Sequence, residues 1–541
     1  MKNYKVKILL FVFVFAIFGF GSASEVGAAS EGEVRNFYID SSYDLYGRSE
    51  ISAELIRTTN SLYFYIEKKW WGSSSPLEQN NIRIALFDLG EEFKNKIYPV
   101  LTANFGQEWR PGIDNDERIA VLFHPMGGSR GGYFRISDGY FRLQAPSSNE
   151  REMVYLNSEF ITTSLVKSLL AHEFIHLITF NQKDRLRRVS EETWLNEARA
   201  EYALTLLGYD YKHEGSNLQR RVRVFLENPS FSLTEWQGVL ADYGVLNLFT
   251  QYLVDHYGVA ILRDSLLSSE VGIASINYAL KKNGFQDDFS QIFSNWTIAV
   301  LMNDCSLGSK YCYKNQDLKN LRIIPESNFI PTTTESSLSV YSQIKDWSAK
   351  WQRIFGGKGG LTFKFNGREG INFKVPYVLC DYTNKCTVNS LNLNGQQQRE
   401  VFIPEFGSKY SSLTLIPSVQ NKLSGFTNNE PVYLFSWDVK TKEFSRQNSL
   451  FNSCSEIKNN LYFGIRNNAE VNCLQEFLKN QGAGIYPEGL VTGNFLSLTK
   501  AAVIRFQEKY TSEILAPWGL TRGTGFVGKT TKAKINQILG I

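Results

Sequence analysis

The segment His172-Glu173-Phe174-Ile175-His176 constrains the fold of this chain more than any other. Its two histidines are four residues apart, and residues at that spacing lie on one face of an α-helix. On a helix, both imidazoles can hold one metal ion, and Glu173 can take a proton from a water molecule that the metal activates. The alternative is a set of unrelated polar residues on a solvated helix face.

The residues around this segment favour a buried helix. Most neighbouring positions are apolar, and buried imidazoles and carboxylates need partners, which a metal ion would supply. The apolar positions are Leu165, Leu169, Phe174, Ile175 and Leu177. Three residues before them are candidate helix caps: Thr162, Thr163 and Ser164.

A catalytic zinc site has three protein ligands and one open position for water. No cysteine precedes Cys305, and the nearby acidic candidates lie in residues 190–202. This stretch has helical composition, with Ser190 or Thr193 as its cap. Glu197 and Glu201 are four apart in it, so both are expected on one helix face.

The pattern HEFIH followed by Trp194-Leu195-Asn196-Glu197 and by Glu201-Tyr202 resembles the gluzincin peptidases. The wider stretch 31–305, including residues 148–153, is similar to hyicolysin-like secreted bacterial peptidases. The resemblance implies a zinc metallopeptidase with one catalytic Zn²⁺. It implies the following roles: His172, His176 and Glu197 as metal ligands, Glu173 as general base, and Glu201 as the acceptor of a ligand histidine's spare N–H. For Glu201, the alternative is an ordinary exposed helix acid.

Two further parts of the site follow from the same resemblance. A tyrosine or histidine from a later helix stabilises the negative oxygen of the transition state, and Tyr243 is the best candidate here. His256 is its rival, and either can be a packed residue with no such role. The strand-like segment Met153–Asn157 is expected to offer its backbone to an extended substrate by strand addition, beside a neighbouring strand at 131–134.

The N-terminus has the composition of a secretory signal peptide. A start with three lysines precedes thirteen apolar residues and then Gly21-Ser22-Ala23. Cleavage is expected after Ala23, or else after Ala29. Removing residues 1–23 lowers the formal charge from +4 to +1, which gives no electrostatic case for nucleic-acid binding. We therefore expect a secreted or cell-wall-associated bacterial protein with no stable membrane anchor.

All six cysteines lie between residues 305 and 473. An even number of cysteines in a secreted chain favours disulfides, although six cysteines allow fifteen pairings. The simplest pairing is local, and it joins Cys305 to Cys312, Cys380 to Cys386, and Cys454 to Cys473.

The length and the changes of composition predict a multidomain chain. Residues 31–305 form an α+β zincin-like catalytic domain with a helix near 81–104 and a strand near 118–123. Residues 325–450 contain short alternating runs typical of a β-sandwich.

In the last eighty residues, Val471, Leu474 and Leu478 share one helix face, and Thr492-Gly493, Phe506-Gln507 and Thr524-Gly525 follow in order. These motifs resemble the small three-helix peptidoglycan-binding domain, which we assign to residues 455–541, with Tyr486 and Asn494 as candidate ligand contacts. The alternative is a small helical packing domain that binds nothing.

These features leave three hypotheses for the function. The favoured one is a secreted zinc endopeptidase that acts on protein or peptide substrates and is anchored to peptidoglycan. The second is a peptidoglycan hydrolase, either a wall endopeptidase or an amidase, that uses the same metal. The third is a non-catalytic wall-binding protein with a relic site, which the intact set of His172, Glu173, His176 and Glu197 argues against.

Overall fold

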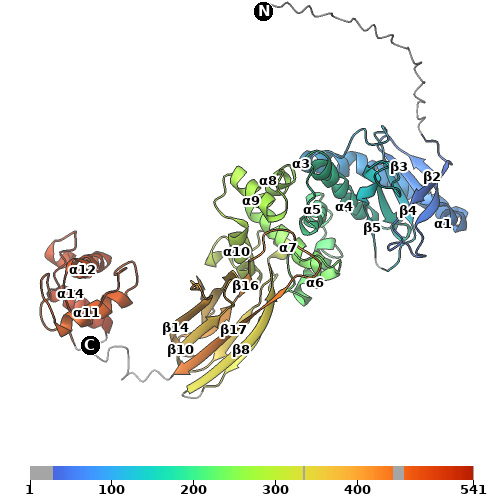
Figure 1. The fold of residues 1–541 in the computed structure, drawn as a ribbon. Coiled ribbons are helices and arrows are strands. Elements are labelled where there is room, and N and C mark those ends of the chain that lie inside the picture. Colours follow the sequence, from blue (N-terminus) through green and yellow to red (C-terminus); the bar gives the residue numbers. More distant parts are fainter. Residues whose placement is uncertain (1–28, 129, 333–334, 443–455, 540–541) are drawn as a thin grey trace, which may run out of the picture.

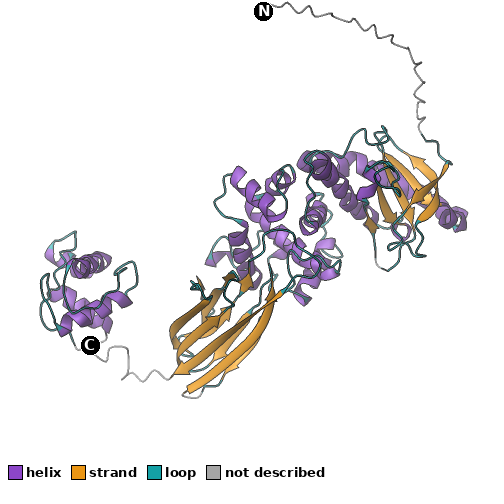
Figure 2. Cartoon of the chain, in the orientation of Figure 1, coloured by secondary structure: helices purple, strands orange, loops and turns teal. Residues whose placement is uncertain are grey.

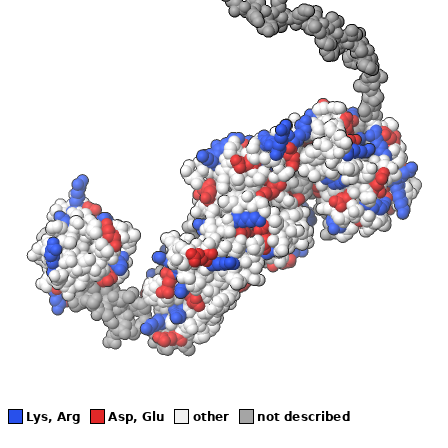
Figure 3. Space-filling model, in the orientation of Figure 1, with Lys and Arg blue, Asp and Glu red and all other residues white. Residues whose placement is uncertain are grey.

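The computed structural model describes residues 29–128, 130–332, 335–442 and 456–539. The expected signal segment 1–23 and Cys454 lie outside these residues. An N-terminal sheet with helices is followed by an all-helical half, a β-rich module and a C-terminal helical unit (Figures 1 and 2). Within the described ranges, no helix is long and apolar enough to cross a membrane. Basic and acidic side chains are interspersed over the face shown in Figure 3.

The N-terminal sheet has six strands in the order β1-β2-β3-β4-β6-β5. The strands are β1 (Val34–Tyr38), β2 (Glu50–Thr58), β3 (Leu62–Glu67), β4 (Ile119–His124), β5 (Gly132–Tyr133) and β6 (Met153–Asn157). β6 runs parallel to β4 on one side and antiparallel to β5 on the other. The expectation that Met153–Asn157 is the free substrate-binding edge is therefore wrong. Every residue of β6 is buried, as in a strand covered on both faces, and the short β5 takes the end of the sheet.

The described part of residues 29–332 contains ten α-helices, of which the first four accompany the N-terminal sheet and the other six form the helical half (Figure 1). The ten are α1 (Lys68–Ser73), α2 (Pro76–Glu92), α3 (Tyr98–Phe105), α4 (Leu165–Thr179), α5 (Thr193–Leu206), α6 (Asn217–Glu227), α7 (Leu240–Tyr257), α8 (Ala260–Leu266), α9 (Gly272–Lys282) and α10 (Phe289–Met302). The helix expected near 81–104 corresponds to α2 and α3, joined by a π-helical turn. α2 begins with a capping box between Ser75 and Glu78.

The caps of the two helices expected to hold the metal differ from the sequence expectation in detail. Ser164 occupies the N-cap position of α4, but its side chain makes no capping hydrogen bond. The N-cap of α5 is Glu192 rather than Ser190 or Thr193. The Glu192 carboxylate instead accepts hydrogen bonds from the Trp194 indole and from the backbone N–H of Gly425, both at 2.7 Å. The start of α5 is therefore tied to a loop of the β-rich module.

The β-rich module folds over into two layers. Its main sheet contains β7 (Glu326–Ile330), β8 (Glu335–Lys345), β9 (Gln352–Gly356), β10 (Gly359–Asn366), β12 (Pro376–Asp381), β13 (Cys386–Ser390), β14 (Gln398–Phe406), β15 (Tyr410–Leu415) and β17 (Val432–Lys442). β14 meets β15 only at the pair Phe406 and Tyr410, where one layer gives way to the other. A small second sheet pairs β11 (Phe373–Lys374) with β16 (Ser418–Val419). Apolar side chains from both layers share one core.

Two tryptophans of this module enter the core of the helical half. The Trp347 ring lies 4.9 Å from the ring of Phe289 and 5.4 Å from that of Phe293, both on α10. The Trp351 indole donates a hydrogen bond to the carbonyl of Thr297 at 2.8 Å. Since both tryptophans are almost fully buried, removing them would cost about 3–5 kcal/mol each. The β-rich module and the helices therefore share a packed interface.

Disulfides join Cys305 to Cys312 and Cys380 to Cys386, as the local pairing predicts. Cys473 is also disulfide-bonded. Its expected partner Cys454 lies outside the described residues.

The C-terminal unit contains α11 (Ala469–Asn480), α12 (Ser497–Lys509), the short α13 (Thr511–Ile514) and α14 (Lys529–Leu539) around a core of its own. It repeats one hydrogen-bonding device. The Gln475 side-chain amide accepts hydrogen bonds from the backbone N–H groups of Thr492 and Gly493 and donates one to the hydroxyl of Thr499. The Gln507 side-chain amide likewise accepts from the N–H groups of Thr524 and Gly525 and donates to the hydroxyl of Thr531. Every partner in the second set is 32 residues beyond its counterpart in the first. The unit is thus built from two related halves.

Candidate metal centre

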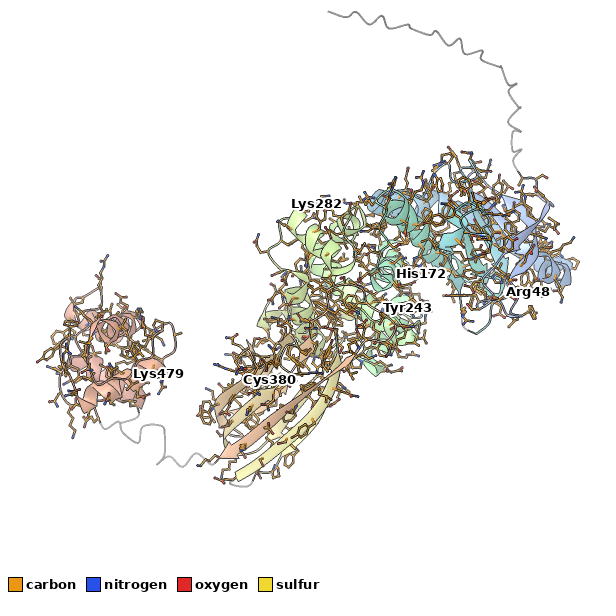
Figure 4. All side chains as sticks on the ribbon, in the orientation of Figure 1. Arg48, His172, Tyr243, Lys282, Cys380 and Lys479 are labelled. Carbon is orange, nitrogen blue, oxygen red and sulfur yellow. A yellow bond between two sulfur atoms is a disulfide. The ribbon has the colours of Figure 1, made fainter. Side chains whose placement is uncertain are left out.

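α4 and α5 bring three potential metal ligands together. His172 and His176 lie one turn apart on α4, and Glu197 faces them from α5. Nε2 of His172 is 3.2 Å from Oε2 of Glu197, and Nε2 of His176 is 3.6 Å from Oε1 of the same carboxylate. One ligand atom from each residue lies within 4.8 Å of the other two. Figure 4 shows the labelled His172 at the junction of the N-terminal and helical halves.

These donor atoms have the spacing that a single zinc ion requires. Bonds of about 2.0–2.2 Å in tetrahedral geometry separate neighbouring donors by about 3.4 Å. The separations of His172 and His176 from the two oxygens of the Glu197 carboxylate, 3.2 and 3.6 Å, lie on either side of that value. Two imidazoles and a carboxylate are also a usual donor set for catalytic zinc, and the fourth position remains for water. The residues therefore fit a zinc ion.

Electrostatics at the centre favour a bound cation. Burial opposes protonation, but the neighbouring Glu197 carboxylate raises the pKa of His172 to about 9. A proton on His172 thus balances the buried negative charge when no metal is present. A metal cation would replace that proton, since histidine ligates in its neutral form.

Glu173 lies beside the two histidines and is buried, with 5% of its surface exposed. Burial, followed by the negative charge of Glu197, raises the pKa of Glu173 to about 8. Gly132 on the edge strand β5 lies directly against it. A Cβ atom at Gly132 would come within 3.0 Å of the Glu173 carboxylate and within 2.7 Å of the Tyr155 carbonyl oxygen. The absence of a side chain at Gly132 leaves room for Glu173.

Glu201 is buried rather than exposed and holds several hydrogen bonds. Arg221 on α6 donates to both of its carboxylate oxygens at 2.7 and 2.8 Å, and the amides of Asn217 and Asn247 donate to Oε2. Burial opposes ionisation, but Arg221 lowers the pKa of Glu201 to about 2. Oε1 of Glu201 lies 3.8 Å from Nδ1 of His172. The carboxylate is therefore ionised and fixed on the side of His172 that faces away from Glu197.

A buried ionic cluster anchors α5 behind Glu197. The Arg199 guanidinium lies 2.8 Å from the Glu191 carboxylate and donates a hydrogen bond to Ser265 at 2.8 Å. The Lys183 ammonium is also fully buried and donates to the carbonyl of Ser265. Because Ser265 lies near the C-terminal end of α8, these contacts join α5 to that helix end and fix the helix that carries Glu197.

Tyr243 and His256 lie on the same helix, α7, but only Tyr243 is beside the centre. The Tyr243 ring is 6.5 Å from the ring of His172 and lies under the guanidinium of Arg221. Burial, followed by the charges of Glu197 and Glu201, raises the pKa of Tyr243, so the phenol remains a proton donor. Nε2 of His256 forms a hydrogen bond with the backbone carbonyl oxygen of Cys312 at 2.8 Å. Of these two candidates, therefore, only Tyr243 lies beside the three potential ligands.

The sequence alone gave no indication of several side chains near the centre. Asn217, Arg221 and Asn247 surround Glu201, and only their positions on α6 and α7 bring them there. Tyr43, in a loop between β1 and β2, is close enough for the charges of Glu173 and Glu197 to raise its pKa, after the effect of burial. No spacing rule connects residue 43 to residue 172, so only the folded chain reveals this neighbour.

Comparisons with known proteins bear on part of the chain. No protein-family model matches it. The chain is 30% identical over 191 residues to the neutral metalloprotease ShpI of Staphylococcus hyicus. The match covers 31% of this chain and 41% of that protein, so it spans less than half the length of the relative. This partial similarity supports a metallopeptidase.

The similar solved structures are remote. PliG of Aeromonas hydrophila, a periplasmic inhibitor of g-type lysozyme, is 12% identical, with 21% of this chain and 97% of PliG covered and a TM-score of 0.14. A pilus subunit of Bacillus endospore appendages is 10% identical, with 20% and 89% covered and a TM-score of 0.12. At TM-scores this low, neither likeness bears on the fold or the function.

Proposed function

We propose that this chain is a secreted zinc-dependent endopeptidase of the gluzincin type that a C-terminal domain anchors to peptidoglycan. The observation that carries the proposal is the convergence of His172, His176 and Glu197 on one point, with Glu173 beside them. The partial similarity to a neutral metalloprotease supports the same chemistry.

In this proposal His172, His176 and Glu197 would hold the metal. A zinc ion there would act as a Lewis acid that lowers the pKa of a water molecule to about 7 and polarises the substrate carbonyl. Glu173 would accept the proton of that water at its carboxylate and pass it to the nitrogen of the leaving amine. Glu201 would accept the N–H of His172 and thereby fix its orientation.

Tyr243 would donate its phenolic proton in a hydrogen bond to the carbonyl oxygen that gains negative charge. Such a donor contributes about 2.7–4 kcal/mol to transition-state stabilisation in comparable sites. The edge strand β5, rather than β6, would pair with the backbone of an extended substrate. A substrate laid along β5 would pass Glu173 at Gly132, where no side chain intervenes.

The proposal is tested by incubating the purified mature protein with casein and, separately, with purified wall sacculi. Casein cleavage that is lost on metal chelation and restored by zinc supports the endopeptidase. Digestion of sacculi without casein cleavage would favour the second candidate, a peptidoglycan hydrolase. That candidate stays open because the resemblance of residues 455–541 to a wall-binding domain fits both activities.

Wall anchoring has a separate test. Residues 456–539 form a unit with its own core, and so residues 455–541 can be deleted without removing core residues of the site. The shortened protein should lose co-sedimentation with sacculi and retain casein hydrolysis. Unchanged co-sedimentation would remove this unit from the proposal.

A further inference from the structure

Arg130 lies at the N-terminal end of the edge strand β5, two residues before Gly132. Its backbone is held in place from β6. The Asn157 side-chain amide donates to the carbonyl of Arg130 at 3.0 Å, and the Asn157 backbone N–H donates to that of Gly131 at 2.8 Å. The start of the edge strand is therefore fixed beside the candidate metal centre.

The Arg130 side chain is held in position but has no counterion among the described residues. Its guanidinium carbon lies 5.0 Å from the centre of the Tyr43 ring, and that ring packs on Tyr133 of β5 at 4.5 Å. The side chain is exposed, and no residue in the described part of the chain forms an ion pair or hydrogen bond with its guanidinium. Arginines beside the ends of the same sheet are paired with carboxylates: Arg48 with Asp44, Arg118 with Asp116, and Arg135 with Asp138. Arg57 on β2 has no carboxylate partner among the described residues, and its guanidinium lies over the ring of Phe87.

The direction of β5 places Arg130 relative to the bond that is cut. A substrate that adds to this edge antiparallel runs from its own N-terminus near the end of β5 towards its C-terminus near Arg130. The reacting carbonyl must lie near Glu173, and therefore near Gly132. Substrate residues on the C-terminal side of the cut bond consequently approach Arg130.

We propose that Arg130 binds a carboxylate on the C-terminal side of the cut bond, either an acidic side chain or the free C-terminus of a peptide. The inference rests on the proposed peptidase function. A guanidinium offers a planar fork that matches a carboxylate in two hydrogen bonds. The Tyr43 ring packs against the guanidinium, and this contact reduces the ordering that substrate binding requires.

Matched peptides test the proposal. One fluorogenic peptide series places Asp or Asn at the first or second position after the cut bond, and a second compares a free C-terminal carboxylate with its amide. Wild-type protein should cleave the carboxylate form with a kcat/KM about 10-fold higher. Arg130→Gln should remove this ratio while leaving the rate on the neutral peptides unchanged, and Arg130→Lys should retain part of it.

A matched variant controls for loss of charge alone. Arg353 is an exposed arginine on β9 in the β-rich module, and Arg353→Gln should preserve the preference. The two peptide series distinguish a side-chain carboxylate from a terminal one. An equal rate for carboxylate and neutral peptides, or a preference that survives Arg130→Gln, would overturn the proposal while the peptidase function stands.

Binding gives a readout that does not depend on turnover. The same peptides are titrated against the Glu173→Gln variant, with and without the added Arg130→Gln change, by fluorescence anisotropy. Tighter binding of carboxylate peptides that requires Arg130 supports the proposal even where no peptide is cut. Failure of all peptides to be cut would count against the proposed peptidase function, and carboxylate-independent binding would count against Arg130.

Discussion

Gly132 and Glu173 lie so close that a single Cβ atom would bring them into conflict. That atom would stand 3.0 Å from the Glu173 carboxylate and 2.7 Å from the backbone oxygen of Tyr155, which cannot move aside within the sheet. Gly132→Ala should therefore displace either β5 or Glu173. We expect at least a 10-fold loss of kcat/KM on casein-derived peptides, since small displacements of catalytic groups are costly.

Gly72 on α1 provides the control for this substitution. It is exposed, and a Cβ atom there would have no neighbour within 4 Å. Gly72→Ala should retain wild-type kcat/KM. Equal activity of the Gly132→Ala and Gly72→Ala variants would show that β5 does not approach Glu173 as described.

Replacing Glu173 by glutamine should separate metal binding from catalysis. The carboxylate of Glu173 is not among the donors of the candidate centre, so Glu173→Gln should keep the metal. Loss of the proton acceptor should lower kcat by about 10²–10⁴-fold. The measurement combines elemental analysis with peptide hydrolysis, and Glu159→Gln, an exposed glutamate, serves as the control. Full turnover by Glu173→Gln would exclude Glu173 as the base.

The buried pair of Arg199 and Glu191 predicts a stability effect away from the chemistry. Arg199→Ala would leave the Glu191 carboxylate buried beside Lys183 without its closest charged partner. Removing one member of such a buried pair costs about 3–5 kcal/mol of unfolding free energy. Urea unfolding followed by circular dichroism measures the change. A loss below about 1 kcal/mol would indicate that the cluster does not anchor α5.

Glu152 predicts how stability depends on pH. Burial raises the pKa of Glu152 to about 7, above its ordinary value of 4.5, so the folded state holds its proton more tightly than the unfolded chain. The resulting stabilisation is complete below about pH 4.5 and is lost as the pH rises through about 7. Its full size is on the order of 3 kcal/mol.

Glu152→Gln isolates this contribution. Glutamine keeps an oxygen that can accept the hydrogen bond from the backbone N–H of Ile113, but it carries no charge at any pH. Between pH 4.5 and 7, the unfolding free energy of the wild type should fall more steeply than that of the variant. Parallel pH profiles from urea unfolding would show that Glu152 ionises normally.

The local parts of the candidate site could be predicted from the sequence, and the parts made by the fold could not. The spacing of His172 and His176 places both rings on one helix face, and the same four-residue spacing places Glu197 and Glu201 on one face of the next helix. The helix caps show the limit of sequence rules. Ser164 stands at the N-cap of α4 but makes no capping hydrogen bond, and Glu192 at the N-cap of α5 accepts a hydrogen bond from Gly425, far away in the sequence. The hydrogen-bond donors to Glu201 could not be predicted, because they come from α6 and α7 and meet only where these helices pack together.

In the sheet, too, the sequence predicts the individual strands but not how they pair. The composition of Met153–Asn157 identifies a strand, but composition does not state whether another strand covers its edge. Pairing of Tyr133 with Tyr155 across β5 and β6 is a contact between residues 22 apart, and it is set by the whole sheet. Likewise, the alternating runs after residue 325 predict strands, whereas the burial of Trp347 and Trp351 against α10 appears only in the folded chain.

The most direct measurement of the central claim is the metal content of the purified protein. Elemental analysis should find one zinc per wild-type chain. Glu197→Ala should lower this to a small fraction, whereas Glu227→Ala, which changes an exposed glutamate, should leave it unchanged. Undiminished zinc in Glu197→Ala, or no bound metal in the active wild-type protein, would contradict the claim that His172, His176 and Glu197 hold one catalytic ion.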